Sequence, residues 1–175
     1  GVYFFMEDGQ ECRLQPGTLR IVRIGTHAVS AGSKSTLWQR LRAHRGLDSG
    51  GGSHRSSIFR LHVGNCIRTR DGIGPSTWAV GDSAAKDVRA GENQLEELVS
   101  EYIGQLRVAI LPINDLPGPD SDRSFIEMNS IGLLTGGPIV DIPPSHWLGS
   151  LSPVKQISES GLWNINYVGS DFHPQ

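Results

Sequence analysis

Glycine and proline recur along most of this chain and divide it into short segments. The 175 residues include 22 Gly and 10 Pro. Glycine breaks regular structure because its backbone is unusually free, and proline because it lacks an amide hydrogen. A chain of this length suits one core, and no internal repeat divides it. We therefore expect a single domain over residues 1–175, with a mobile Gly-rich loop at 46–57 and an irregular connector at 71–91.

The overall composition is that of a folded protein. Hydrophobic residues make up 37% of the chain and charged residues 19%. No apolar run approaches the length of about 18 residues that a membrane span needs, and no basic and apolar leader opens the chain. We therefore expect a cytoplasmic protein without a membrane partner. Cys12 and Cys66 lack the spacing of a metal motif or a disulfide framework, so we expect two buried thiols.

The formal net charge of −2 hides an asymmetry along the chain. Residues 1–70 carry eleven basic and four acidic side chains, whereas residues 71–175 carry five basic and fourteen acidic ones, so the two parts have net charges of +7 and −9. This division predicts a polarised molecule whose basic side approaches nucleic acid. On this interpretation a solvated helix face, turned away from the substrate, is lined by Glu92, Glu96, Glu97 and Glu101.

Apolar periodicity predicts an antiparallel hairpin followed by helices and one further strand. A helix near residue 40 is amphipathic, because Leu37 and Leu41 fall on one face. Arg40 and His44, four residues apart, share another face that we expect to be exposed. In chain order, the expected elements are a strand at 1–6, a turn at 7–10, a strand at 19–24, helices at 36–45, 58–67 and 92–106, a buried strand at 107–113 and a helix at 122–135.

Common phosphate-binding and hydrolase motifs are absent. Residues 31–36 follow a strand and precede a helix, as a P-loop does. However, Ser33 separates Gly32 from Lys34, and the P-loop needs these two residue types adjacent so that loop amides and ammonium converge on one phosphate. No GxSxG elbow supports a serine hydrolase.

What remains is a set of short features in a fixed order. From the N-terminus they are Gly1-Val2-Tyr3 in the first strand, Arg23-Ile24-Gly25 at the end of the next, Arg40 and His44 on one helix, Glu127 on a later helix, and Asn164 in the tail. In this order the chain resembles the GIY-YIG endonuclease superfamily over essentially its whole length. The resemblance implies an α+β fold, with a small antiparallel β-sheet flanked by helices and family-specific insertions, and a metal-dependent nuclease activity.

The resemblance also implies a role for each matched residue. Tyr3 takes the tyrosine of the first motif, and Arg40 takes the catalytic arginine. His44 matches the His or Tyr that follows one helical turn later. Glu127 takes the place of the sole protein ligand of a divalent metal, Mg²⁺ or Mn²⁺.

Two positions depart from the family pattern or leave a choice. Arg23 stands where the second motif normally begins with Tyr, and His27 is another stand-in for the missing phenol. Asn164 is the candidate for the family's late asparagine, and Asn166 stays open as the alternative.

These residue types suit phosphodiester hydrolysis. An unperturbed tyrosine has a pKa near ~10, so Tyr3 needs positive charge nearby to act as the general base. Arg23 and Arg40 supply that charge and hold the phosphate, since a guanidinium offers a planar fork to two oxygens. His44 assists by bonding the phosphate or orienting the attacking water, and Glu127 holds the metal.

Basic residues outside this set are expected to contact DNA, partly through a loop that becomes ordered on binding. They are His27, Lys34, His54, Arg55 and Arg60. The alternative for the loop is a solvated connector without a substrate role.

The predicted function is a DNA endonuclease, in restriction or another prokaryotic DNA-processing role. One site cuts one strand, so a double-strand break needs a homodimer or two sequential visits. Three alternatives stay open: an inactive nucleic-acid-binding module on the same fold, an RNA-directed nuclease, and a structural domain that interacts through its acidic half. Taken singly, the residues also fit structural roles, such as a capping box of Ser124 with Glu127, or a solvated helix face for Arg40 and His44.

Overall fold

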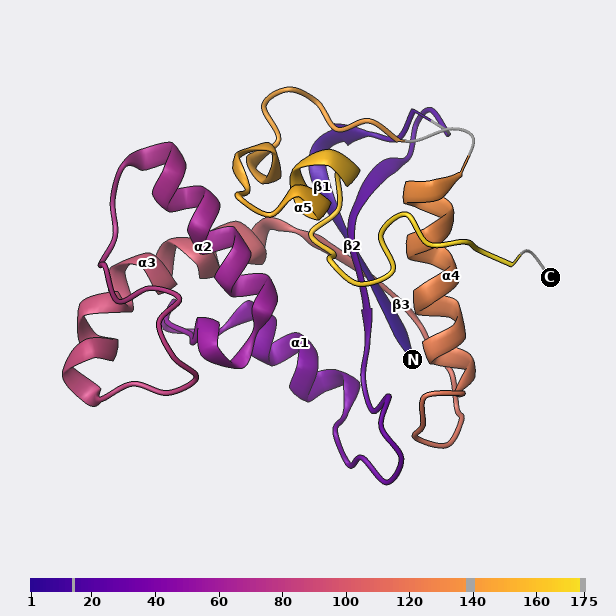
Figure 1. The fold of residues 1–175 in the computed structure, drawn as a ribbon, viewed down its shortest axis with the longest axis horizontal. Coiled ribbons are helices and arrows are strands. Elements are labelled where there is room, and N and C mark those ends of the chain that lie inside the picture. The colour runs from indigo at the N-terminus through magenta and orange to yellow at the C-terminus, as the bar shows by residue number, and fades with distance from the viewer. Residues whose placement is uncertain (14, 138–140, 174–175) are drawn as a thin grey trace.

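The computed structural model describes residues 1–13, 15–137 and 141–173, drawn in Figure 1. A small three-stranded antiparallel sheet is flanked by helices, as predicted. None of the helices in the described ranges is long and apolar enough to span a membrane. In chain order the elements are β1 (Val2–Glu11), β2 (Leu19–Thr26), α1 (Leu37–Arg45), the 3-10 turn η1 (His54–Ser56), α2 (Ile58–Asp71), α3 (Lys86–Gln105), β3 (Arg107–Leu111), α4 (Asp122–Gly136), the 3-10 turn η2 (Leu148–Leu151) and α5 (Lys155–Ser160).

The sheet has the strand order β2-β1-β3, and both pairings are antiparallel. The predicted turn at 7–10 is wrong, because β1 continues to Glu11 and pairs there with Leu19. The chain reverses later, between Glu11 and Leu19. Gly17 adopts a φ of +84° in this turn, a left-handed conformation that glycine takes without steric cost.

A β-bulge in β2 changes which side of the sheet its residues face. Phe5 pairs with Arg23, whereas the next residue of β1 pairs with Ile21. Val22 is therefore left without a partner in the ladder. Val22 lies in the same buried cluster as Phe5, and the Arg23 guanidinium lies 4.7 Å from the centre of the Phe59 ring. The bulge thus turns two consecutive residues, one apolar and one charged, toward the same helices.

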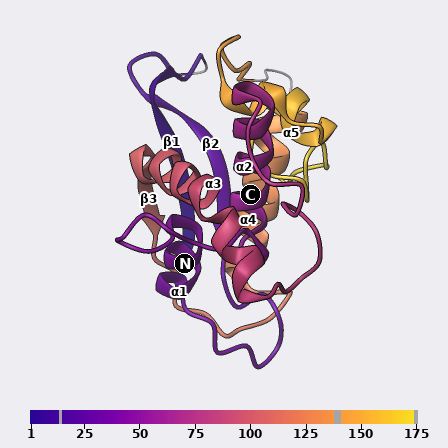
Figure 2. The same ribbon diagram turned by 90° about the vertical axis from the view of Figure 1, so that its left-hand side faces the viewer.

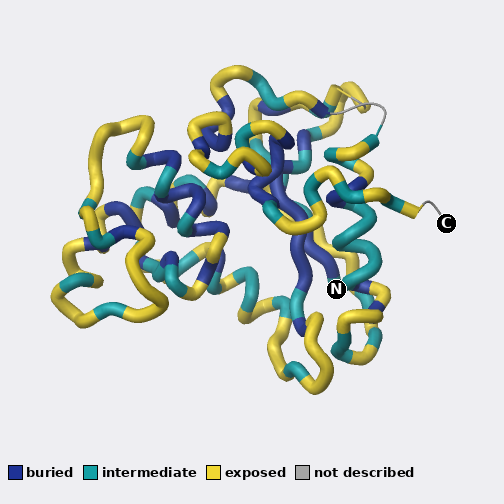
Figure 3. The backbone as a smooth tube through the Cα atoms, viewed as in Figure 1, coloured by how far each residue is buried: buried dark blue, intermediate teal, exposed yellow. Residues whose placement is uncertain are grey.

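Helices lie on both sides of the sheet (Figures 1 and 2). Helix α4 covers one side, where Val2 and Ile24 cluster with Ile131. Helices α1, α2 and α3 and the C-terminal segment lie on the other side, where Tyr3 and Phe5 join a larger cluster. The alternation of Val2 and Tyr3 follows from the two-residue period of a strand. Figure 3 shows that the buried part of the backbone is concentrated in β1, β2 and the inner turns of α2.

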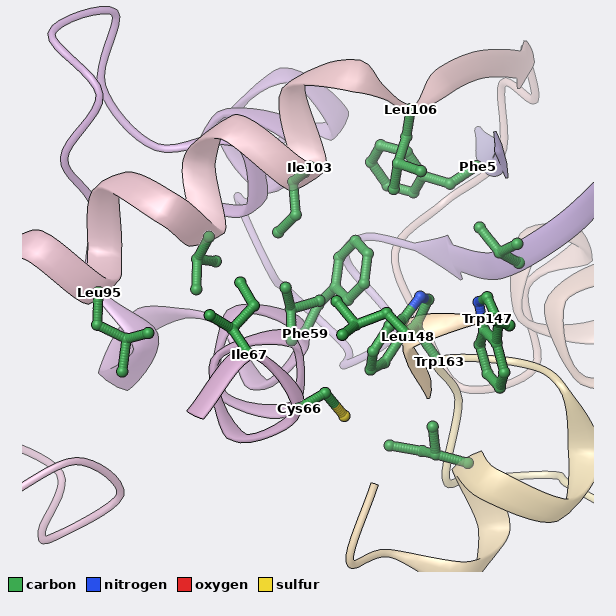
Figure 4. Packing of buried hydrophobic residues seen from close by; sticks show 14 of the residues in the cluster. Phe5, Phe59, Cys66, Ile67, Leu95, Ile103, Leu106, Trp147, Leu148 and Trp163 are labelled. Atoms are coloured by element: carbon green, nitrogen blue, oxygen red, sulfur yellow. The ribbon is translucent and has the colours of Figure 1, made fainter. Parts of the chain in front are cut away.

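The larger cluster is built around aromatic rings, several of which are labelled in Figure 4. The ring of Trp163 lies 5.9 Å from that of Phe59 and 5.2 Å from that of Trp147, measured between centroids. Buried aromatic rings remove a large apolar area from water. The C-terminal tail, which periodicity did not assign to any element, therefore closes the main core.

The outer edge of β2 is covered by the segment that follows α5. The Trp163 amide donates to the carbonyl of Val22 at 2.7 Å. The side chain of Asn164 accepts from the Ile24 amide at 3.0 Å and donates to the Ile24 carbonyl at 2.8 Å. This asparagine thus substitutes for a strand neighbour at the edge of the sheet.

Strand β3 forms the other edge and differs from the prediction. A buried strand was expected at 107–113, but all five residues of β3 are exposed, including Val108, Ile110 and Leu111. Apolar composition is typical of buried and edge strands alike, so the sequence pattern could not separate them. The expectation of burial is wrong because β3 pairs on one side only, with β1.

Two helices are longer than predicted. Helix α3 begins at Lys86, so the end of the 71–91 segment is helical rather than irregular. Helix α2 continues to Asp71, where Gly72 at a φ of +65° ends it in a left-handed cap.

Both cysteines are free thiols. Cys66 is buried as expected, and burial raises its pKa to about 12, which makes it unreactive. Cys12 is partly exposed because it lies in the turn between β1 and β2, which corrects the expectation of a second buried thiol.

Candidate active site

Tyr3 is held in a buried chain of hydrogen bonds. Its phenol oxygen lies 2.7 Å from Nε2 of His44, and Nδ1 of the same ring lies 2.7 Å from the hydroxyl of Ser57. Tyr3 sits opposite Gly25 in the sheet, and a Cβ at Gly25 would overlap the phenol. The glycine that ends the Arg23-Ile24-Gly25 motif is therefore required for the tyrosine ring to reach His44.

Ser57 ties His44 to the start of α2. Ser57 is the N-cap of α2, and its oxygen accepts from the amide of Arg60 at 3.3 Å. The same hydroxyl lies 2.7 Å from Nδ1 of His44. The His44 ring is therefore held between Ser57 and Tyr3, with one ring nitrogen bonded to each.

His44 is uncharged in this environment. Burial, together with the positive charges of three nearby arginines, lowers its pKa to about 2. The ring therefore meets Tyr3 as a neutral imidazole, and not as a cation.

A pocket of about 280 Å³ lies beside the covered edge of β2. Its walls come from β2, α1, α2, α4 and the C-terminal segment. The polar side chains that line it are Arg23, Thr26, Arg40, His62, Glu127, Asn164, Asn166 and Tyr167. The structure thus brings Arg23, Arg40, Glu127 and Asn164 together at one pocket. Tyr3 and His44 adjoin it, since Tyr3 acts electrostatically on Arg23, and the charges of Arg23 and Arg40 lower the pKa of His44.

Arg23 is a buried cation at the wall of this pocket. It donates from Nη1 to the Trp163 carbonyl at 2.6 Å and forms no ion pair with a described carboxylate. Its Nε has no partner among the described residues. Burial and the charge of Arg40 lower the Arg23 pKa, while Tyr3 and Glu127 act against that shift. An anion entering the pocket would supply the missing countercharge.

The arrangement matches a known family. Residues 1–175, the whole chain, match the family model of the GIY-YIG domain. This chain belongs to the GIY-YIG family. GIY-YIG domains are nuclease domains, and the α+β fold with a small flanked sheet agrees with this membership. No curated protein and no solved structure matches the chain.

Glu127 is the carboxylate that this GIY-YIG domain presents to the pocket. The capping-box alternative for Glu127 is removed, because Ser121 is the N-cap of α4 and bonds the amide of Ser124. Burial raises the pKa of Glu127, while the charge of Arg23, the Thr26 amide and the charge of Arg40 oppose the rise. The carboxylate thus remains without an ion-pair partner among the described residues.

Glu127 fits a divalent cation whose other ligands come from water and substrate. The described residues contain no group of three or more His, Cys, Asp and Glu side chains that could enclose a metal. Mg²⁺ commonly uses one or two carboxylates and takes its other ligands from water and substrate phosphates. Glu127 is an oxygen donor of that kind at the wall of a pocket suited to phosphate. The donor set therefore fits Mg²⁺ or Mn²⁺ held jointly with a substrate, and not a preformed cage.

Asn164 and Asn166 occupy different environments in the GIY-YIG pocket. Both ends of the Asn164 amide are bonded to the backbone of Ile24, so this residue positions β2. Asn166 lines the same pocket and is exposed. Its neighbour Tyr167 adopts a φ of +65°, which a non-glycine residue rarely does, at the pocket rim.

Three of the predicted DNA contacts are buried instead, and the structure corrects them. Arg55 pairs with Glu92 through two nitrogens, at 2.5 and 2.9 Å. Arg60 is fully buried and bonds Glu96, while His54 bonds the same carboxylate at 2.9 Å. These side chains bind helix α3 through Glu92 and Glu96, which face the protein, so the expected solvated face is wrong for these two acids. Glu97 and Glu101 are exposed, as expected.

The two remaining predicted contacts lie away from the pocket. His27 bonds the carbonyl of Ser35 through Nδ1 at 3.0 Å, and its Nε2 lies 3.4 Å from the guanidinium of Arg123 on α4. Lys34 is exposed on the loop between β2 and α1. Neither residue replaces the missing phenol at the site of Tyr3.

Ser57 and His62 are site residues that sequence reasoning missed. Ser57 ends the Gly-rich segment and precedes an apolar helix, which is a recognisable N-cap signal, but nothing in the sequence ties it to His44. His62 lies one turn after Ile58 on α2, and both line the pocket. The face of this short helix could not be assigned from periodicity.

Proposed function

We propose that this GIY-YIG domain is a divalent-metal-dependent endonuclease that hydrolyses phosphodiester bonds in DNA. The observation that carries the proposal is the pocket itself, which Arg23 and Arg40 line together with the carboxylate of Glu127, none of them ion-paired with another described residue. Two cations and one carboxylate match the needs of a phosphodiester, which requires charge stabilisation and a hard metal ion. A role in restriction or another prokaryotic DNA-processing event is part of this proposal.

The arginines bind and polarise the phosphate. Arg40 lines the pocket from α1, and Arg23 lines it from β2. Each guanidinium donates two parallel hydrogen bonds to a pair of phosphate oxygens, which a lysine cannot do. Both charges also stabilise the additional negative charge that develops when water attacks the phosphorus.

Tyr3 serves as the general base for that water. Its phenol oxygen lies 2.7 Å from Nε2 of His44, and the Arg23 cation acts on it electrostatically. Tyr3 is 1% exposed, so the role requires that Arg23 move onto the substrate phosphate and open a path to the phenol. The Trp163 carbonyl is the one acceptor that Arg23 would give up among the described residues.

Glu127 would hold Mg²⁺ or Mn²⁺ together with phosphate oxygens, and the metal would supply charge neutralisation and a more acidic bound water. Because burial raises the pKa of Glu127, protons compete with the metal at a higher pH than for an exposed carboxylate. We therefore expect that a higher metal concentration is needed for the same cleavage rate as the solution becomes more acidic.

Incubation with supercoiled plasmid in Mg²⁺ or Mn²⁺ tests the proposal. The parent and a Glu159→Gln control, altered at an exposed acid of α5, are expected to nick the plasmid, while a chelator stops both. Arg40→Ala is expected to lose nicking. Failure of the parent to cut DNA under any metal condition would contradict the proposed activity.

A non-catalytic nucleic-acid-binding module is the second candidate function. Two observations favour it: Arg23 replaces the second tyrosine, and Tyr3 is buried. Such a module binds duplex without cutting it.

An RNA-directed nuclease is tested in the same assay with labelled single-stranded and duplex RNA. Sedimentation of the protein with and without a short duplex shows whether a homodimer provides the second site that a double-strand break needs.

A further inference from the structure

His62 is a buried histidine whose ring makes no hydrogen bond to the described residues. It lies on α2 and lines the pocket, and its residue exposure is 5%. Both Nδ1 and Nε2 are buried without a partner in the described part of the chain. A buried polar group left unpaired costs roughly 1–3 kcal/mol of stability, so an apolar residue would be the more stable choice here.

The other two buried histidines behave differently. His44 bonds Tyr3 and Ser57 through its two nitrogens. His54 bonds Glu96 through Nδ1, and its Nε2 lies 3.4 Å from the amide of Ala79. Among the three buried histidines described, His62 is thus the one that lines the pocket and the one without a hydrogen-bond partner.

Unpaired donors gather around this part of the pocket. Nε of Arg23 is buried without a partner, as are the nitrogens of His62. Arg40 lies on the same pocket without an ion pair, and Glu127 is the carboxylate opposite. Hydrogen-bond donors without acceptors are satisfied by an anion with several oxygens, such as a phosphate.

We propose that His62 is a substrate-binding residue that donates a hydrogen bond from its ring to the scissile phosphate, beside the guanidinium of Arg23. This inference rests on the proposed phosphodiesterase function and adds a further group to its site. The geometry supplies the reason, since His62 lines the pocket where the phosphate binds, and neither of its ring nitrogens has a partner among the described residues. In the neutral form, which burial and the charge of Arg23 favour by lowering the pKa to about 4, one nitrogen carries a hydrogen to donate.

Substitution of His62 by an apolar residue distinguishes a substrate-binding role of the ring from a structural one. His62→Leu is expected to keep or raise the melting temperature, because it removes two unpaired nitrogens. In the plasmid assay its kcat/KM is expected to fall about 10- to 100-fold, as for a lost hydrogen bond to a charged group. His62→Gln keeps an N–H donor and is expected to recover part of that loss. Leu61→Ala on the same helix serves as a control for general effects on α2.

A second measurement does not depend on cleavage. Inorganic phosphate added to the ¹⁵N-histidine-labelled parent is expected to shift the ring signals of His62 and to leave those of His54 in place. In Arg23→Gln the same addition is expected to need a higher phosphate concentration, because the neighbouring cation is gone.

The outcomes distinguish the inference from the proposed function. If the parent nicks DNA, and His62→Leu nicks it equally well while phosphate leaves the His62 signals unchanged, the inference is overturned and the function stands. If the parent does not cut but phosphate shifts His62, the function fails and the binding role stands. A large loss of stability in His62→Leu would also overturn the inference, because it would show that the ring has a structural role.

Discussion

At the scale of single residues, the geometry around Tyr3 depends on one absent side chain. Gly25 lies opposite Tyr3 in the sheet, and any Cβ there would overlap the phenol. The Tyr3 oxygen must remain within reach of His44 for the hydrogen bond between the two rings to form. Gly25, the last residue of the Arg23-Ile24-Gly25 motif, thus determines where the ring of Tyr3 from the first motif can lie.

Gly25→Ala is therefore expected to abolish nicking while the fold is retained. The added methyl forces the Tyr3 ring away from His44, and overpacking of this kind costs about 1–3 kcal/mol. Gly91→Ala is the matched control, because a Cβ at Gly91 meets nothing within 4 Å and alanine favours a helix. Plasmid nicking and urea denaturation measure the two effects. Full activity in Gly25→Ala would show that the contact between Tyr3 and His44 is dispensable.

His44 also makes stability depend on pH. Its pKa is about 2 in the folded chain against 6.5 for an ordinary histidine, so the unfolded chain binds a proton that the folded chain does not. Stability is therefore greatest above pH 6.5 and falls as the pH decreases, by up to about 1.4 kcal/mol per pH unit from this residue.

Urea denaturation of the parent and of His44→Phe between pH 7 and pH 5 measures this contribution. The difference in unfolding free energy between the two proteins is expected to shrink as the pH falls. A difference that stays constant over this range would contradict the neutral, buried state of His44.

At the scale of elements, Arg60 joins three helices. It donates from Nη1 to the carbonyls of His44 and Arg45 at the end of α1, at 3.0 and 3.2 Å. From Nη2 it bonds the Glu96 carboxylate at 2.6 Å and the Ser100 hydroxyl at 3.0 Å on α3. The Gly-rich segment makes room for this, since a Cβ at Gly52 would overlap the guanidinium. The position of His44 in the active site is therefore supported from α2 and α3.

Removal of this arginine is expected to destabilise the fold strongly. Arg60→Met leaves the buried Glu96 charge uncompensated, which typically costs about 3–5 kcal/mol. The double variant Arg60→Met, Glu96→Leu is expected to regain much of that loss. Arg45→Ala breaks the exposed pair with Asp48 and is expected to cost at most about 1 kcal/mol. Equal effects of the Arg60 and Arg45 substitutions in urea denaturation would contradict this account.

The elements were largely predictable, but their faces and contacts were not. The spacing of Leu37 and Leu41 predicted α1 correctly. The sheet and the helices that carry Arg40 and Glu127 also lie where periodicity predicted them. The bulge that turns Arg23 toward the helices depends on pairing between strands, which no local pattern encodes. From the sequence alone Glu96 was expected to be solvated, because its partner Arg60 lies 36 residues away along the chain.

At the scale of the whole molecule, the basic and acidic halves of the sequence meet instead of facing apart. Arg55 and Arg60 from the first half pair with Glu92 and Glu96 from the second. The predicted polarity is therefore weaker than the sum of charges suggests, since part of it is neutralised inside the fold. The pocket keeps Arg23 and Arg40, and α1 also carries Arg42 and Arg45.

This distribution predicts the salt dependence of nucleic-acid binding. Each phosphate neutralised on duplex DNA contributes about −0.9 to the slope of log K against log salt concentration. Arg40→Gln is expected to reduce the slope by about that amount. Arg55→Gln is expected to leave it unchanged, because that side chain is 7% exposed and paired with Glu92. Fluorescence anisotropy with a labelled duplex over a salt series measures both, and a reduced slope in Arg55→Gln would show that the loop does contact DNA.

The pocket as an active site is tested most directly by Glu127→Gln, measured for nicking and for stability in the same preparation. Burial raises the pKa of Glu127 above its unfolded value, so the ionised group lowers stability at neutral pH. We predict that the variant loses Mg²⁺- and Mn²⁺-dependent nicking of supercoiled plasmid and melts at the same or a higher temperature than the parent. Nicking by Glu127→Gln at the parent's rate would contradict the assignment of this pocket as the active site.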